Sequence, residues 1–176
     1  TIMDAGSSQI SFNVKLHSTT SDKDGATNVY LTVDNNGGHE LNSTTSSTTF
    51  TLMSKTPSSQ AYNINWTSVG KTSINFNWTK GSGLGTLVLA RQAGSISDTP
   101  TNGNDYTANS VFTNGDAIGS SYVVYNDVNS AVSVTGLSSF TQYCFRLFSY
   151  NGSTASTRSY NTSIGTNTQR SRYTLF

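Results

Sequence analysis

The chain has few charged residues and only one cysteine. Asp, Glu, Lys and Arg make up 11% of its 176 residues, whereas about 25% is usual in soluble domains. The net charge of +1 comes without a basic stripe, which argues against nucleic acid or an anionic membrane as a partner. No apolar run approaches the length of a membrane span. With Cys144 as its single cysteine, the chain has no internal disulfide framework.

Hydroxyl and amide side chains are abundant instead. The chain contains 27 Thr, 29 Ser and 18 Asn, together 74 of the 176 residues. Thr suits the outer face of a strand, and Ser, Asn and Gly suit turns. Ala and Leu, which favour helices, are sparse, and 11% aromatic residues argue against disorder. The composition therefore predicts an all-β fold. It is also typical of exported bacterial surface proteins, so we expect an extracellular or cell-surface location.

The first 55 residues contain three short candidate strands. Apolar residues alternate with polar ones at Ile10–Leu16 and Val29–Val33, and a third strand is expected at Phe50–Leu52. So few strands cannot bury a stable core alone, so this segment must pack on other strands. We expect either its own chain or the sheet edge of a neighbouring subunit to supply them. A first residue of Thr, with no visible signal peptide, indicates processing or a fragment.

From Pro57 onward the strand pattern is denser. Alternating or continuous apolar segments separated by Gly, Ser and Asn predict strands near Ile64–Trp66, Ile74–Trp78, Leu87–Leu89, Tyr122–Tyr125, Val132–Leu137 and after Tyr143. Residues 92–121 lack a strand pattern, although compact domains usually connect their strands by short loops. The whole reads as a β-sandwich with one long insert.

The run Gly136–Gly152 predicts a strand end, a corner and a long strand. A Tyr at the start of such a strand sends its hydroxyl back to the upstream backbone, so Leu137 and Tyr143 are the expected structural corner. Strand alternation then divides the following residues between two faces. Phe145, Leu147 and Ser149 share the Tyr143 face, while the opposite face carries Cys144, Arg146, Phe148 and Tyr150. The expected core comprises Trp66, Ile74, Phe76, Trp78, Val132, Val134, Leu137, Tyr143, Phe145 and Leu147.

Residues 58–176 resemble a fibronectin type III domain. The similarity lies in Asn77–Thr79, in Gly136–Leu137 followed by Thr141–Tyr143, and in Ser149–Gly152, although Ser139 stands where Pro is usual. Three further motifs are similar to the variant found in tandem in secreted and surface proteins of Bacteroidota: Tyr106–Asn109, Ile118–Gly119 and Tyr122–Asn126. The resemblance implies an immunoglobulin-like sandwich over 56–176. Residues 1–55 lie outside it, and from their strand pattern we expect an additional N-terminal β-segment, either part of a preceding repeat or an assembly arm. An echo of Thr48–Leu52 in Ser171–Leu175 agrees with a tandem array.

Candidate reactive residues lack the neighbours that chemistry needs. His17 and His39 have no carboxylate or Ser at a triad spacing. Asp22–Gly25 resembles a calcium loop only faintly, because Ala26 stands at a ligand position and no Glu follows. Cys144 has no sequence motif for a base beside it. We therefore expect no catalytic residue, no cofactor and no metal site, and the chain is predicted not to be an enzyme.

Two surface features remain as hypotheses. Arg146, Phe148 and Tyr150 share the outer face of one strand and would make a glycan-stacking face if exposed. The preferred reading is that the long insert or the N-terminal segment covers them, since exposed rings invite aggregation. Five Asn-X-Ser/Thr triplets would matter only on a glycosylating secretory route; they begin at Asn42, Asn65, Asn77, Asn151 and Asn161.

The sequence thus predicts a non-enzymatic extracellular structural or adhesive module: a surface filament subunit, an adhesin or a spacer repeat. Its partners would be other proteins, with homo-oligomers or filaments formed through strand edges. One alternative is a phage virion surface protein, as a capsid decoration or a fibre. The other is a carbohydrate-binding module of a secreted enzyme, with a glycan as ligand. Fold alone does not separate these functions.

Overall fold

The computed structural model describes residues 28–29, 50–51 and 53–176. These residues form strands and one short 3-10 turn, η1, at Ala155–Thr157. The strands are β1 (Asn28–Val29), β2 (Phe50–Thr51), β3 (Tyr62–Val69), β4 (Ile74–Thr79), β5 (Gly85–Gln92), β6 (Ala117–Ile118), β7 (Ser121–Asp127), β8 (Ala131–Val134), β9 (Gln142–Asn151), β10 (Ser159–Tyr160) and β11 (Gln169–Tyr173).

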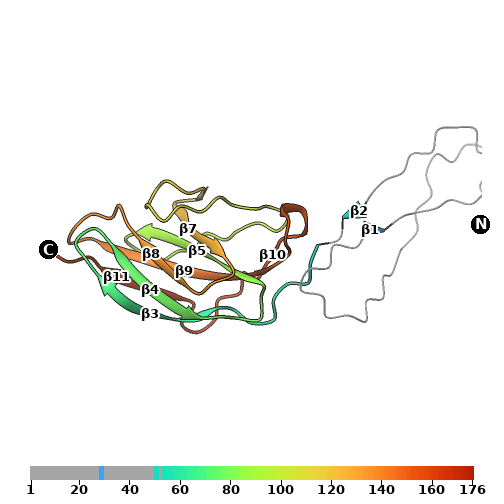
Figure 1. The fold of residues 1–176 in the computed structure, drawn as a ribbon, viewed down its shortest axis with the longest axis horizontal. Helices are drawn as coiled ribbons and strands as arrows, with labels where there is room; N and C mark the ends of the chain where they lie inside the picture. The colour runs from blue at the N-terminus through green and yellow to red at the C-terminus, as the bar shows by residue number, and fades with distance from the viewer. Residues whose placement is uncertain (1–27, 30–49, 52) are drawn as a thin grey trace, which may run out of the picture.

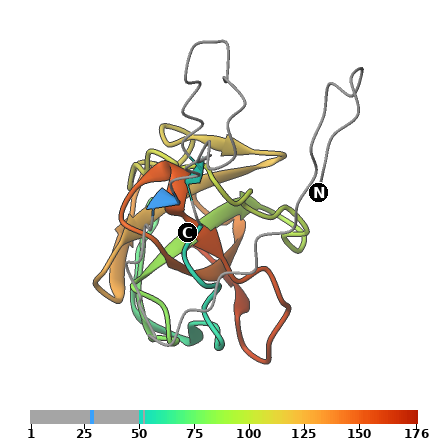
Figure 2. The same cartoon turned by 90° about the vertical axis from the view of Figure 1, so that its right-hand side faces the viewer.

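Two antiparallel sheets face each other in the part of the chain from residue 53 onward (Figures 1 and 2). The smaller sheet has the order β3-β4-β8. The larger has the order β10-β9-β5-β7-β6, and β11 also pairs with β9. Strands β10 and β11 contact the two ends of one edge of β9, because β10 pairs near Asn151 and β11 near Tyr143. The sequence prediction of an all-β sandwich is confirmed.

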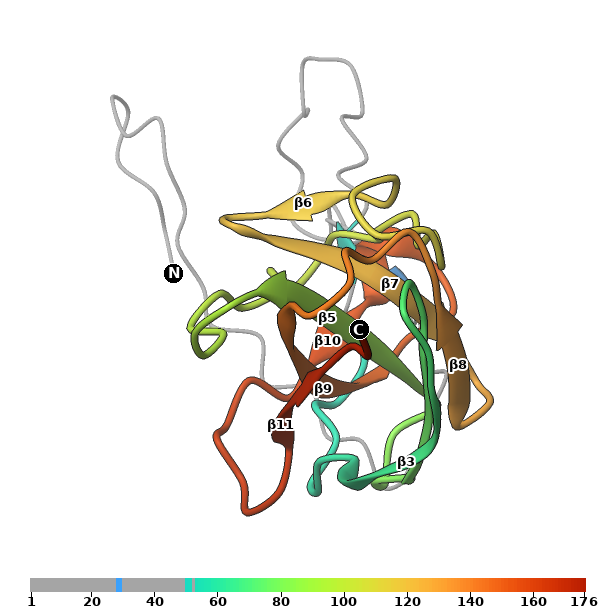
Figure 3. The same ribbon diagram turned by 90° about the vertical axis from the view of Figure 1, so that its left-hand side faces the viewer.

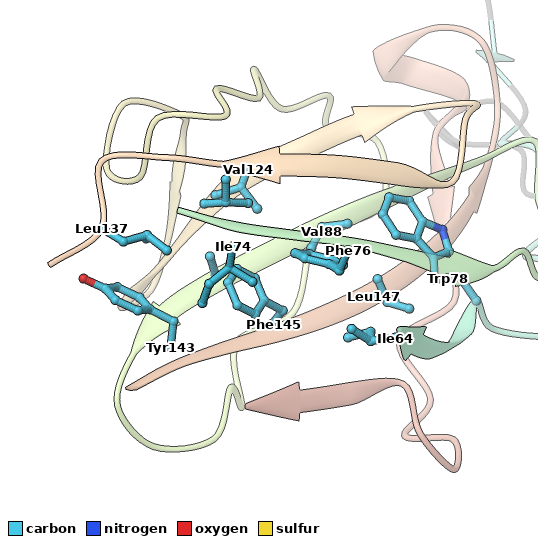
Figure 4. Close-up of a cluster of buried hydrophobic side chains, with 13 residues drawn as sticks. Ile64, Ile74, Phe76, Trp78, Val88, Val124, Leu137, Tyr143, Phe145 and Leu147 are labelled. Carbon is cyan, nitrogen blue, oxygen red and sulfur yellow. The ribbon is translucent and has the colours of Figure 1, made fainter. Parts of the chain in front are cut away.

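The main core lies between the sheets, where the period of two turns alternate side chains inward. In β4 the residues Ile74, Phe76 and Trp78 are buried and their neighbours are not. Figure 4 shows these side chains meeting Val88, Phe145 and Leu147 from the opposite sheet. The predicted core is found here, with Trp66 and Val132 packed against it as partly buried residues.

A second core covers the outer face of the large sheet. It is formed by side chains of the sheet together with Ile96 of the long insert; those of the sheet are Leu87, Leu89, Val123, Cys144, Phe148, Tyr150 and Tyr160. Tyr106, Ala108 and Ile118 of the long insert pack against this cluster. The insert therefore acts as a lining over the sheet, and β9 is buried from Tyr143 to Asn151 because both of its faces are covered.

The sandwich has two distinct poles. At the C-terminal pole, which we define by loops 70–73 and 136–141 and by residues 174–176, Leu175 N–H donates to Gly70 C=O. The opposite pole contains residues 54–60, where Ser54 N–H donates to Thr157 C=O. The chain thus joins the sandwich at one end and leaves it at the other (Figure 1).

Strands β1 and β2 form a separate two-stranded antiparallel ribbon in the N-terminal segment. They fall on two of the three candidate strands, with Val29 opposite Phe50. The remaining N-terminal predictions lie outside the described residues: the strand at 10–16, His17, His39, the Asp22–Gly25 loop and the triplet at Asn42.

Candidate functional site

The Tyr143 corner lies at the C-terminal pole. The Tyr143 ring is 1% exposed, and its hydroxyl accepts a hydrogen bond of 3.0 Å from the backbone N–H of Ser138. Leu137 is buried beside it, as Figure 4 shows. Phe112 of the insert contacts the Tyr143 ring edge-on, with ring centroids 5.1 Å apart. This is the geometry of a tyrosine corner, which fixes the turn between two strands and carries no chemistry.

The proposed ligand face on β9 is not exposed. Arg146 is 3% exposed, Phe148 0% and Tyr150 3%. The insert and β10 cover them, with Tyr160 edge-on to the Tyr150 ring at 5.8 Å. The hypothesis of an exposed glycan-stacking face is therefore wrong, because these rings form the second core. The preferred reading, that the insert covers them, agrees with the structure.

Arg146 is a buried cation that binds backbone carbonyls. It donates to Ile96 C=O at 3.0 Å and to Thr162 C=O at 3.4 Å, and its guanidinium lies 4.6 Å from the centre of the Phe148 ring. No carboxylate within residues 53–176 forms an ion pair with it. Burial lowers the pKa of this guanidinium, although an arginine stays charged at neutral pH. Arg146 thus holds two covering segments onto β9.

The remaining titratable groups of the insert are also engaged in structure. Asp98 accepts hydrogen bonds from the hydroxyls of Ser121 and Ser120 and from the Ser120 N–H. The Ser121 hydroxyl is the main reason that the pKa of Asp98 lies below its ordinary value, and partial burial opposes that shift. Asp105 pairs with Arg158 at 2.8 Å. These contacts attach the insert to the rest of the sandwich.

Within residues 53–176, no three His, Cys, Asp or Glu side chains gather in a way that could hold a metal ion. Cys144 is buried as a free thiol in the second core. None of the described helical segments is both long and apolar enough to cross a membrane.

A buried polar seam joins residues 54–61 to β9 and β10. The Gln60 side-chain amide accepts from Ser149 N–H at 2.7 Å and donates to Asn161 C=O at 2.6 Å. The hydroxyl of Ser149 accepts from Ala61 N–H at 2.8 Å. The Gln60 side-chain amide therefore accepts and donates backbone hydrogen bonds at an irregular sheet edge, as a peptide group of a neighbouring strand would. Sequence reasoning missed this seam, because neither the residue types nor their spacing is periodic.

The seam also uses two of the five candidate glycosylation residues. Asn151 donates from its side-chain nitrogen to Lys55 C=O at 2.7 Å, and Asn161 donates to Pro57 C=O at 2.9 Å. Both side chains are buried. A glycan on either nitrogen would displace the seam, so these triplets are structural in the folded chain. Asn65 is exposed and Asn77 is half-buried.

Comparison with known proteins gives similarity only to solved structures. No protein-family model matches the chain, and no curated protein matches it. A fibronectin type III domain of human fibronectin type III domain containing protein 3 is 21% identical, with 69% of this chain and 89% of that one covered and a TM-score of 0.41. A computationally redesigned β-sandwich protein is 16% identical, with 66% of this chain and 90% of that one covered and a TM-score of 0.41.

A third similar structure is the extracellular region of rat CD45, domains d3–d4. It is 12% identical, covers 98% of this chain and 75% of that one, and has a TM-score of 0.33. At such identities and scores none of the three bears on activity or binding. Independently of these comparisons, the strand order and the tyrosine corner define a fibronectin type III-like β-sandwich.

Proposed function

We propose that the chain is a non-enzymatic extracellular structural or adhesive module that spans a distance along its long axis, as a spacer repeat, an adhesin segment or a filament subunit. The observation that carries this proposal is the path of the chain, which joins the sandwich at one pole and leaves it at the other (Figure 1). Residues 1–55 and 56–176 are the two parts that we assign to it. A place in a tandem array, of the variant known from secreted and surface proteins of Bacteroidota, suits this path.

Both end segments lie alongside the central strand β9. Residues 54–61 are bonded to β9 through Gln60 and Ala61. They are also bonded to β10 through the hydroxyls of Thr56 and Ser159, and to η1 through the Ser54 N–H. Strand β11 pairs with β9 over five residues, from Gln169 opposite Arg146 to Tyr173 opposite Gln142. A load applied between the two ends would pull both segments along the axis of β9. Bonds loaded in this way share the force, whereas bonds at an unzipping fork break one at a time.

The chemistry of the described residues supports a non-enzymatic role. Catalysis needs titratable groups with tuned pKa values in a cleft. Here Asp98 is held by Ser120 and Ser121, and Arg158 lies against the Tyr150 ring at 4.0 Å while it pairs with Asp105. Each such group is used to fasten a loop. The carbohydrate-binding alternative has lost its ring pair, since Phe148 and Tyr150 are core residues.

Single-molecule stretching of the full chain tests the proposal. With tags at the two ends, the sandwich should unfold in one step and release roughly 400 Å of contour length, at up to about 3.6 Å per residue. As a control, the C-terminal tag is moved into loop 128–130, at the pole where the chain enters the sandwich. Both tags then act at that pole, and the load no longer runs from pole to pole. We expect a clearly lower unfolding force in that geometry. Equal forces in the two geometries would contradict a load-bearing role.

A further inference from the structure

Large apolar side chains are exposed together at the C-terminal pole. Phe140 is 59% exposed, Tyr173 54% and Phe176 77%, and Leu175 lies beside them. The Phe140 and Phe176 rings stack with centroids 3.9 Å apart. We call these four residues the terminal aromatic face. Figure 3 views the molecule from this end, with the C-terminus and β11 facing the reader. On a surface made mostly of hydroxyl and amide groups, such a cluster marks an interaction surface.

The backbone of Phe140 is strained. Its φ of 51° is in the left-handed region, which costs a residue with a Cβ about 1 to 2 kcal/mol and costs glycine almost nothing. The Phe140 ring adds nothing to either core. Phe140 is thus strained in its backbone while its side chain lies outside both cores, and such strain is typical of functional positions.

The terminal aromatic face borders a groove of about 370 Å³, lined by Phe140 and residues 171–176. Arg172 is the charged side chain of this lining, and none of the four Asp side chains within residues 53–176 belongs to it. A segment that carries both apolar and acidic side chains would therefore complement the groove.

The chain itself contains such a segment. Residues 1–52 have five Asp or Glu and two Lys, whereas residues 53–176 have four Asp and eight Lys or Arg. Residues 22–34 carry three Asp and one Lys, a net charge of −2, beside the alternating apolar residues Val29, Leu31 and Val33. Strand β1 lies in this segment.

Chain connectivity keeps strand β1 away from the aromatic face of its own molecule. Asn28 pairs with Thr51, and Ser54, bonded at the opposite pole, follows within about 11 Å of extended chain. Strand β9, whose ten residues run between the poles, is about 30 Å long at 3.3 Å per residue. Strand β1 thus cannot lie across the C-terminal pole of its own chain.

We propose that the terminal aromatic face binds residues 22–34 of a second copy, so that copies associate head to tail. The proposal rests on the structural role given above and names the partner for it. Apolar residues of the incoming segment cover Phe140, Tyr173 and Phe176, and its carboxylates approach Arg172. Because these charges are exposed, salt weakens the attraction.

The test is the mass of the full chain in solution over a range of concentrations, by sedimentation equilibrium at low and high salt. We expect association that weakens at high salt. Phe140→Gly should weaken it at least tenfold while the melting temperature stays the same or rises, because glycine relieves the left-handed backbone. Ile164→Asn is the matched control, since Ile164 is an exposed apolar residue outside the face, and it should associate like the parent.

Charge reversal identifies the occupant. Arg172→Glu should weaken association, and so should the joint change Asp22→Lys with Asp24→Lys. Mixing these two variants should restore association between unlike copies. A chain that is monomeric at every concentration would overturn the proposal, as would association that survives Phe140→Gly or that ignores the Asp22 and Asp24 changes. None of these outcomes alters the stretching result, which concerns one molecule, so the two proposals fail separately.

Discussion

Replacing Gln60 by Leu tests the polar seam that joins residues 54–61 to β9 and β10. The two side chains are similar in size, so the substitution removes hydrogen bonds and leaves the packing nearly unchanged. Three bonds are lost: the one accepted from Ser149 N–H and the two donated to the carbonyls of Asn161 and Ser163. Ser163 is exposed, so water replaces the third partner.

The other two partners lie in the interior. Ser149 and Asn161 are buried, and a buried group left without a hydrogen bond costs about 1 to 3 kcal/mol. Two such groups cost about 2 to 6 kcal/mol, and burial of the more apolar leucine offsets about 1 to 2 kcal/mol of this. The expected loss in the free energy of unfolding is therefore about 3 kcal/mol, or roughly 10 °C in melting temperature.

Thermal and urea unfolding followed by circular dichroism measure this loss. Gln169→Leu is the matched control, because Gln169 is half-buried and its Oε1 accepts one bond of 3.2 Å, from Ile96 N–H. We expect it to cost less than about 1 kcal/mol. If Gln60→Leu unfolds no more easily than Gln169→Leu, the seam does not stabilise the sandwich as reasoned here.

Three further predictions concern the corner and the titratable groups. Tyr143→Phe should cost about 1 kcal/mol, because the orphaned Ser138 N–H lies at the exposed side of the corner; an unchanged melting curve would contradict the corner bond. Burial raises the pKa of Tyr125 to about 12, above the value of about 10 in the unfolded chain. The stability that the protonated Tyr125 contributes is therefore complete below pH 10 and is lost toward pH 12. Absorbance at 295 nm measures this, and ionisation of every tyrosine near pH 10 in the native protein would refute it. The lowered pKa of Asp98, due mainly to the Ser121 hydroxyl, gives stability that is present above the unfolded pKa and lost as pH falls through the folded one; Asp98→Asn should flatten that acid limb in pH-dependent urea unfolding, and an unchanged limb would contradict it.

Strands β3, β4, β5, β7, β8 and β9 and the two faces of β9 could be predicted because they follow from local periodicity, whereas β6, β10 and β11 lack such a pattern. Once Tyr143 is placed inward, alternation assigns Phe145 and Leu147 to one core and Cys144 and Phe148 to the other, and the structure has them so. What alternation does not give is whether the second face is open. That depends on residues 92–121, which touch the sheet at scattered points such as Ile96 and Tyr106 and so leave no period in the sequence.

The polar seam and the backbone at Phe140 could not be predicted, for different reasons. Gln60 meets its partners across 89 and 101 positions of sequence, and an amide in a Ser- and Asn-rich chain carries no sign of such a pairing. At Phe140 the usual signals of a left-handed residue, Gly or Asn, are absent. The triplets at Asn151 and Asn161 show the converse case, since a familiar motif there marks buried structural amides.

In this chain of low charge, backbone groups satisfy the buried polar side chains Arg146 and Gln60. Arg146 is satisfied by the carbonyls of Ile96 and Thr162, and none of the few carboxylates within residues 53–176 pairs with it. Gln60 is satisfied in the same way, by backbone groups. Bonds to uncharged backbone groups depend on geometry, and because those groups do not titrate, such bonds change little with pH near neutrality. We therefore expect the segments held by Arg146 and Gln60 to stay attached as the pH changes near neutrality, which suits the structural role proposed above.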